Sequence, residues 1–183
     1  EKDVIYEERR SRVDSSPFGR LLEEFSATAF SAHPYKNPII GWPSDIRNTT
    51  IADARAFRDK FYAPSSFTIA IVGDVDAGEM RNLADKYFAD MAYEEPAPEL
   101  RVEEPAQRGE RRFVIEEQSQ PIYLEGYLTV DNQHPDFQAL NLLGSIMSGG
   151  RTSRLYSRMV VDDQIALQVG AQNGYPGTKY PGL

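Results

Sequence analysis

The sequence contains no cysteine and only two histidines among its 183 residues. The lack of cysteine excludes disulfide bonds and thiolate zinc ligands, so any metal site has to use histidine or carboxylate. No apolar run approaches the roughly 20 residues that a membrane-spanning helix needs. Basic residues are also scarce, since 20 Lys and Arg stand against 28 Asp and Glu for a net charge of −8. This balance disfavours nucleic acid as a partner, because phosphate groups are bound by basic stripes.

The sequence does contain a pair of carboxylates at its start. Glu1 and Glu8 lie seven positions apart in a helix-like segment, EKDVIYEERR. Seven residues make about two helical turns, so the two side chains return to within about 20° of each other. Val4 and Ile5 lie between them and indicate a side of the helix that leans inward. We therefore expect both carboxylates to face the same binding partner.

The spacing alone leaves the partner of these carboxylates open. A carboxylate on a buried face needs a cation, a proton or hydrogen-bond donors. The cation can be a divalent metal, or it can be an arginine such as Arg9 or Arg12. A third interpretation is a solvated acidic face, which is the usual role of such charges.

The two histidines, His33 and His134, are each followed by proline. Such dipeptides favour extended or turn geometry, so we expect both histidines in loops or at a helix start. Hydrogen bonding within a turn is the simpler interpretation, and zinc ligation is the alternative. The sequence also has no nucleophile-elbow pattern, so it does not support a nucleophilic hydrolase.

The pattern of apolar residues predicts an α+β fold. Two consecutive helices are expected from Glu1 to about Phe30, followed by a loop rich in proline and glycine over residues 32–43. Thr50 with Asp53, and Asp76 with Glu79, are typical of capped helix starts. Further helices are expected over residues 136–150 and 151–163, and strands over residues 67–75, 111–117, 120–130 and 165–172.

Composition also predicts the division into domains. Between residues 93 and 110, three prolines alternate with six glutamates, which is typical of a linker. We therefore predict one unit over residues 1–92, a linker over 93–110 and the start of a second unit over 111–183. The chain begins without methionine and stops just after a strand-like run, as expected of an internal piece of a longer polypeptide.

Four segments together resemble the M16 metallopeptidases, the family of pitrilysin, insulin-degrading enzyme and the mitochondrial processing peptidase. They are EKDVIYEERR, AHPYKNPIIGW, FRDKFYAPSSFTIAIVGDVDAGEMRNLADKYF and LLGSIMSGGRTSRLYSRMV, in the order of the family. The resemblance implies zinc-dependent proteolysis, in which two histidines of an H-x-x-E-H motif bind zinc and its glutamate activates water. It also implies that Glu8 is the third zinc ligand and that Glu1 is a supporting carboxylate one heptad earlier.

The H-x-x-E-H motif is absent from this sequence, and the resemblance implies that it lies before residue 1. One carboxylate cannot replace three ligands, so we expect the chain alone to be inactive and to bind zinc weakly. The alternative is a non-catalytic M16-like partner subunit that binds peptide or builds a complex. A plain α+β interaction module is a third possibility.

The resemblance further implies an architecture and partners. An M16 half consists of two similar units with mainly antiparallel sheets covered by helices, and two halves enclose a chamber for peptides or unfolded polypeptides. We therefore expect a peptide substrate and a second M16 half or subunit. The loop and strand segments are most similar to bacterial members, which favours the periplasm or cell envelope over the cytoplasm.

Overall fold

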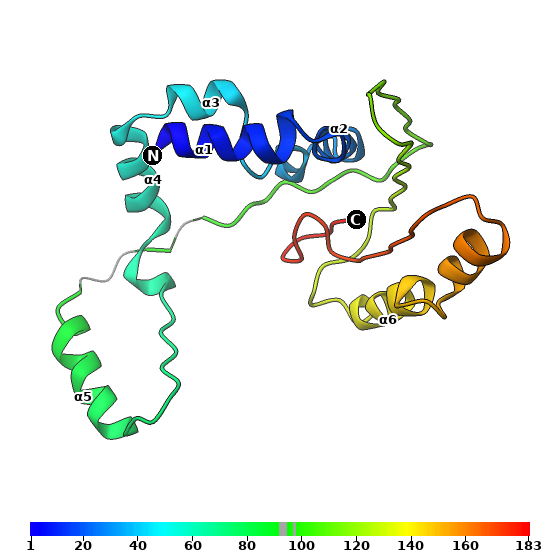
Figure 1. The fold of residues 1–183 in the computed structure, drawn as a ribbon. Helices are drawn as coiled ribbons and strands as arrows, with labels where there is room; N and C mark the ends of the chain where they lie inside the picture. Colours follow the sequence, from blue (N-terminus) through cyan, green and yellow to red (C-terminus); the bar gives the residue numbers. More distant parts are fainter. Residues whose placement is uncertain (92–94, 97) are drawn as a thin grey trace. The chain divides into compact units, whose positions relative to one another are not determined.

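The computed structural model describes residues 1–91, 95–96 and 98–183 (Figure 1). The chain forms two compact units, Glu1–Ile46 with Val102–Leu183, and Arg47–Arg101. The first unit contains α1 (Lys2–Arg9), the π-helical segment η1 (Arg10–Asp14), α2 (Pro17–Ala29), the short turn η2 (Pro34–Lys36), α6 (Phe137–Ser148) and the π-helical segment η4 (Tyr156–Asp162). The second contains α4 (Ile51–Phe61), the short turn η3 (Pro64–Ser66) and α5 (Ala77–Phe88), and α3 (Pro43–Asn48) crosses the boundary.

The helices begin where local capping residues allow them to. At α2, the Ser16 hydroxyl accepts a hydrogen bond from the Gly19 amide, and Pro17 occupies the first turn. At α4, Thr50 and Asp53 form the reciprocal capping box. At α5, the Asp76 carboxylate accepts a hydrogen bond from the Glu79 amide. The predicted helix starts are therefore confirmed.

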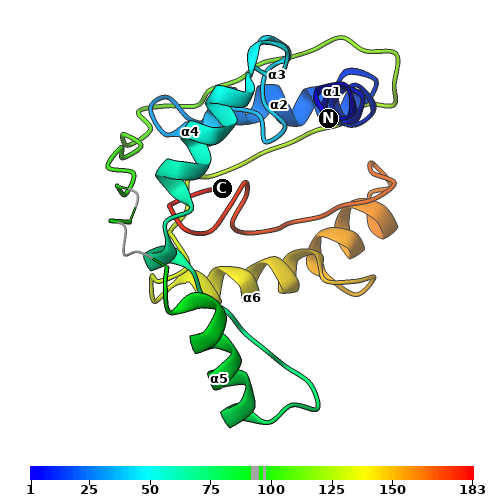
Figure 2. The ribbon, with the colours of Figure 1, turned by 90° about the vertical axis from the view of Figure 1, so that its left-hand side faces the viewer.

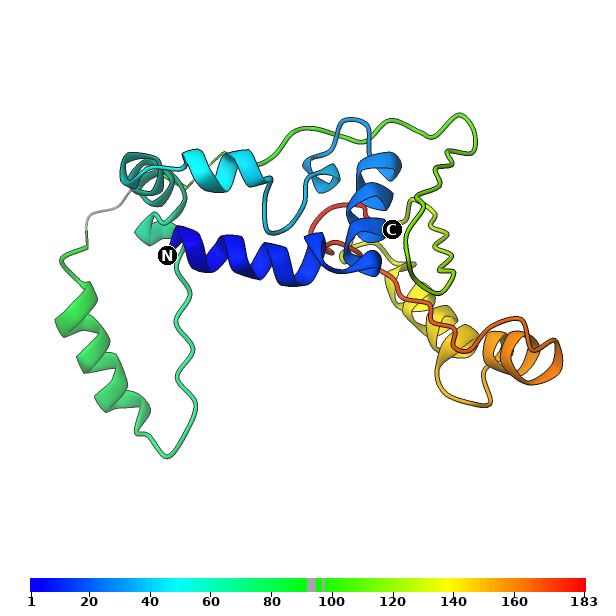
Figure 3. The same ribbon diagram turned by 45° about the horizontal axis from the view of Figure 1, so that its top comes forward.

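The first two helical segments are joined by a short turn at Ser15 and Ser16, directly before α2 (Figure 3). A Cβ atom at Gly19 would overlap the carbonyl oxygen of Arg12. The first turn of α2 therefore packs directly on the backbone of η1. The prediction of two consecutive helices up to about Phe30 is confirmed, and the two helical segments predicted over residues 136–163 correspond to α6 and η4 (Figure 2).

The predicted α+β fold with mainly antiparallel sheets is wrong, because the described part of the chain contains no strand. The four segments predicted as strands, residues 67–75, 111–117, 120–130 and 165–172, are drawn as plain trace in all three views (Figures 1, 2 and 3). In the first of them Val72 is 96% exposed. The regular secondary structure of the described residues is therefore helical.

The reason for this error is that a strand depends on a neighbour. Apolar and β-branched residues make a segment suitable for a pleated surface, but a strand exists only where its amides and carbonyls pair with another segment. A few isolated backbone bonds occur, such as those from the amide of Thr129 to the carbonyl of Gly182 and from Asn132 to Thr178, both 2.8 Å long. They do not extend into a ladder.

A small aromatic core holds the first unit together. Phe30 is 1% exposed and lies at the end of α2. Its ring meets the Tyr35 ring edge-on at 5.7 Å, and the His33 ring lies 6.2 Å away. Tyr180 from the end of the chain packs against His33 at 5.2 Å. This core joins the residues that follow α2 to the C-terminal loop.

The domain boundaries at residues 92/93 and 110/111 stay a prediction, and residues 92–94 and 97 lie outside the described residues. A search of the described helices finds none with the length and apolar character needed to cross a membrane.

Candidate functional site

Glu1 and Glu8 both belong to the first helix, as the spacing predicts. Glu1 occupies the N-cap position of α1, and its carbonyl accepts a hydrogen bond from the amide of Ile5 at 3.1 Å. Glu8 lies in the last turn of that helix. Both residues are exposed. Val4 and Ile5 are exposed too, so the prediction of an inward-leaning side is wrong for the described residues.

Within the part of the chain that the structure describes, the carboxylate of Glu8 has one ion pair, to Arg12 one turn further along at 3.2 Å. The side chains of Glu8 and Arg12 are 45% and 71% exposed. An ion pair between exposed groups contributes at most about 1 kcal/mol, because water solvates both charges well. Arg12 was one of the partners that the sequence allowed. This weak pair leaves the Glu8 carboxylate available to a stronger cation.

A zinc ion needs more ligands than this helix supplies. Structural and catalytic zinc sites use at least three protein ligands in fixed geometry. Within the described residues, no group of three or more His, Cys, Asp or Glu side chains is placed to hold a metal ion. The exposed Glu8 carboxylate therefore does not form a zinc site by itself within the described residues.

The residue beside Glu8 has a different environment. Arg9 is 4% exposed, and its guanidinium donates to both carboxylate oxygens of Glu23 on α2, at 2.7 and 2.9 Å. It also donates to the carbonyl of Gly41 at 2.9 Å. The hydrogen bond to Glu23 and the nearby charges of Glu23 and Asp14 raise the pKa of Arg9 above its ordinary value, although burial alone would lower it. Arg9 is therefore bound to Glu23 and does not serve as the partner of Glu8.

A second carboxylate, Glu104, is held by backbone amides. Its oxygens accept hydrogen bonds from three consecutive amides that follow α2, those of Ser31 at 2.6 Å, Ala32 at 2.8 Å and His33 at 2.8 Å. Nearby, Arg111 donates to the carbonyls of Thr28 and Ala29 at the end of α2, at 3.0 and 2.9 Å. This part of the acidic, proline-rich segment is therefore tied to the end of α2.

The two histidines have the roles that their X-Pro context indicates. The Nδ1 atom of His33 accepts a hydrogen bond from the amide of Tyr35 at 3.2 Å. The Nδ1 atom of His134 accepts from the amide of Asp136 at 3.1 Å. The prediction of hydrogen bonding within turns is confirmed for both. His33 is also buried, and its Nε2 atom has no hydrogen-bond partner in the described structure.

Acid is expected to destabilise the first unit through His33 and Glu104. Burial lowers the pKa of His33, against the opposing pull of Glu104. Burial alone would raise the pKa of Glu104, but the hydrogen bonds from the three amides and the charge of Arg111 outweigh it, so the pKa lies below its ordinary value. In both cases the unfolded chain takes up the proton more readily, so stability is complete above the unfolded pKa and is lost as the pH falls. Stability should fall below about pH 6.5 for His33 and again below about pH 4.3 for Glu104.

Urea unfolding between about pH 7.5 and pH 3.5 measures this dependence. His33→Gln should remove the loss of stability below about pH 6.5, and Glu104→Gln should remove the further loss below about pH 4.3. A wild-type unfolding midpoint that stays constant over the whole range would contradict the expectation.

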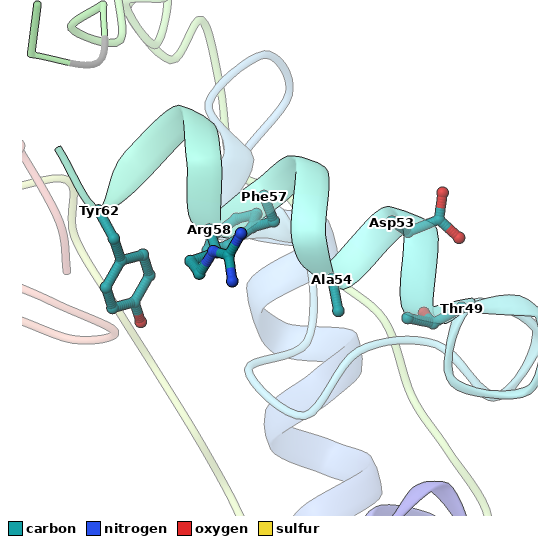
Figure 4. Close-up of a pocket in the computed structure, with 6 residues that line it drawn as sticks. All are labelled: Thr49, Asp53, Ala54, Phe57, Arg58 and Tyr62. Atoms are coloured by element: carbon teal, nitrogen blue, oxygen red, sulfur yellow. The ribbon is translucent and has the colours of Figure 1, made fainter. Parts of the chain in front are cut away.

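The second unit has a shallow depression along α4 (Figure 4). It is lined by residues of one helix and its ends, namely Thr49, Asp53, Ala54, Phe57, Arg58 and Tyr62. Arg58 is already paired with Asp59 at 2.5 Å, and Asp53 belongs to the capping box. The hydrogen bonds from the Thr50 side chain and backbone lower the pKa of Asp53. The polar groups here therefore serve the helix and form no ligand cluster.

Comparison with known proteins decides the family. A family model described as the peptidase M16 inactive domain matches residues 48–180. The zinc protease PqqE of Helicobacter pylori is 34% identical over 179 residues, which cover 94% of this chain and 40% of that protein. The chain belongs to the M16 peptidase family. An uncharacterized zinc protease of Mycobacterium leprae is 26% identical over 162 residues, with 87% of this chain and 36% of that protein covered.

Comparison with solved structures supports an M16-like fold. The crystal structure of a protease from Helicobacter pylori matches with a TM-score of 0.85 and 32% identity, over 98% of this chain and 45% of that one. A peptidase M16 inactive domain from Pseudomonas fluorescens matches with a TM-score of 0.69 and 23% identity, over 98% and 43%. This chain thus has an M16-like arrangement and spans less than half of the relatives that it matches.

The family match separates two parts of the chain. Residues 48–180 correspond to the domain that the family model describes as inactive, whereas Glu1 and Glu8 lie before that range. Sequence reasoning did not find Glu23 and Glu104, the carboxylates that fix the surroundings of α1 and α2. The signal for Glu104 was its place among the acids of the predicted linker, but nothing in the pattern distinguished it from the other five.

Proposed function

We propose that this chain is part of a zinc-dependent endopeptidase, with Glu8 as a zinc ligand and Glu1 as a supporting carboxylate. The observation that carries the proposal is the exposure of both acids on the first helix, where Glu8 has only the weak Arg12 ion pair among the described contacts. The name zinc protease, which several M16 relatives bear, supports it. The remaining ligands and the water-activating glutamate belong to an H-x-x-E-H motif outside this chain.

In this proposal the residues of this chain would help to bind the zinc ion and to orient its ligands. Bound zinc would lower the pKa of a water molecule and polarise the peptide carbonyl. Glu8 contributes one negative oxygen ligand from the last turn of α1. Glu1, about two turns earlier on the same side, adds negative charge that favours a cation and can accept hydrogen bonds from neighbouring groups. The substrate class is peptides or unfolded polypeptides, with a second M16 half or subunit completing the binding space.

The family relationship also supports a bacterial origin, since the relatives reported above are bacterial proteins. A periplasmic or cell-envelope location is part of the same proposal.

Removal of zinc from the full-length protein tests this function. A chelator should lower hydrolysis of an unstructured peptide by more than about 100-fold, because the metal supplies both the nucleophile and the charge stabilisation. Stoichiometric zinc should restore activity, whereas magnesium should not, because it prefers octahedral oxygen ligands. Hydrolysis that is insensitive to chelation would refute the proposal. A full-length protein that binds peptide without cleaving it would favour the non-catalytic partner instead.

A further inference from the structure

The helix that carries Glu1 and Glu8 has one buried side chain among the described residues, that of Arg9. Among the described residues of α1, Arg9 is the buried one, and the others are exposed or partly exposed. Burial of an arginine is rare unless its charge is paired. The orientation of α1 against α2 therefore depends strongly on what Arg9 binds.

The contacts of Arg9 hold its guanidinium group in one orientation. Both carboxylate oxygens of Glu23 accept from its two terminal nitrogens, which is the bidentate geometry that adds direction to strength. The carbonyl of Gly41 accepts a third hydrogen bond. Gly41 has φ +91°, a left-handed conformation that glycine adopts without strain. The ring of Trp42 lies 5.9 Å from the guanidinium carbon and covers it.

The π-helical segment after α1 adds a fourth contact. Asp14 follows Arg9 by five residues, and its carboxylate lies 3.4 Å from the Nε atom of Arg9. In an α-helix a residue five positions on points well away, but the wider π turn returns it toward the same side. The hydrogen bond from the amide of Ser15 to the carbonyl of Arg10 at 2.9 Å is the i→i+5 bond of this turn. The end of α1 is thus shaped around Arg9.

We propose that Arg9 is a positioning residue for the zinc-ligand helix, an inference that rests on the proposed function. Adjacent residues of a helix differ by about 100° in direction, so fixing Arg9 against Glu23 fixes the direction of Glu8. Arg9 does not neutralise Glu8, because its charge is already matched by Glu23 and Asp14. It acts on the metal only through the helix, as residues that orient a ligand do.

Zinc affinity and a cobalt spectrum of the full-length protein test this role. Arg9→Met should weaken zinc binding by about 10- to 100-fold, the range typical of residues that orient a ligand. It should also shift the visible absorption bands of the cobalt-substituted protein, which report ligand geometry. Arg10→Met is the matched control, since Arg10 is exposed and pairs only with Glu7 among the described residues. Arg9→Lys keeps the charge but loses the planar fork, so it should restore affinity only in part.

Glu23→Gln tests the same pair from its partner and keeps the side-chain volume, so it remains informative if Arg9→Met folds poorly. Its zinc affinity should fall within the same range. Wild-type affinity and an unchanged cobalt spectrum in folded Arg9→Met or Glu23→Gln would overturn the positioning role, even if their melting temperatures fall. If Glu8→Gln leaves zinc binding unchanged, the proposed function fails instead, whatever the Arg9 variants show.

Discussion

Glu8→Gln in the full-length protein is expected to lower kcat/KM for a peptide by more than about 100-fold, because changes that merely disturb a ligand already cost 10- to 100-fold. The substitution removes the negative charge and replaces a carboxylate ligand by a neutral amide. It should leave folding almost unchanged, since the side chain is nearly half exposed and makes one weak ion pair. Steady-state kinetics on an unstructured peptide, with circular dichroism to verify folding, measure the effect.

Glu7→Gln is the matched control for this prediction. Glu7 is the adjacent residue of α1; its side chain is 62% exposed and pairs with Arg10 at 3.0 Å. Its substitution should change kcat/KM by less than about threefold, as expected for an exposed ion pair. Glu1→Gln should give an intermediate loss of about 10- to 100-fold, because Glu1 supports the site without being a ligand. Equal activity in Glu8→Gln and Glu7→Gln would contradict the assignment of Glu8.

Phe30→Ala is expected to give the largest loss of stability, about 3–5 kcal/mol in the free energy of unfolding. Among the described residues Phe30 is the large side chain that is fully buried, and its removal leaves a cavity beside Tyr35 and His33. Those rings pack against Tyr180, so the cavity also loosens the attachment of the C-terminal loop. Urea unfolding followed by circular dichroism measures the change.

Phe18→Ala is the corresponding control on the same helix. Phe18 is 49% exposed, so its removal takes away less buried apolar area and should cost less than about 1.5 kcal/mol. If Phe18→Ala destabilises the protein as much as Phe30→Ala, the aromatic core is not where the described structure places it.

The helices of this chain were predictable because their signals are local. Capping hydrogen bonds form within one helical turn, and the structure contains those between Thr50 and Asp53 and between Asp76 and Glu79. The spacing of Glu1 and Glu8 likewise predicted a shared helix, and the fourth position after Glu8 supplied its arginine.

The absence of strands and the presence of the buried ion pair were not predictable, because both depend on residues far apart in the sequence. Residues 67–75 have a strand composition, but pairing is decided by a distant segment, and the described residues provide none. Arg9 and Glu23 are 14 positions apart on two helices, and an arginine on a helix is normally exposed. Glu104 looked like one acid of a linker, whereas its three amide donors come from a turn some 70 positions earlier.

The zinc content of purified full-length protein is the most direct test of the central claim that Glu8 is a metal ligand. Wild type and Glu7→Gln should each contain about one zinc ion per chain after dialysis, as expected for a site of three protein ligands. Glu8→Gln should lose most of its zinc under the same conditions while remaining folded. A folded Glu8→Gln protein that retains about one zinc ion per chain, with wild-type affinity, would contradict the account.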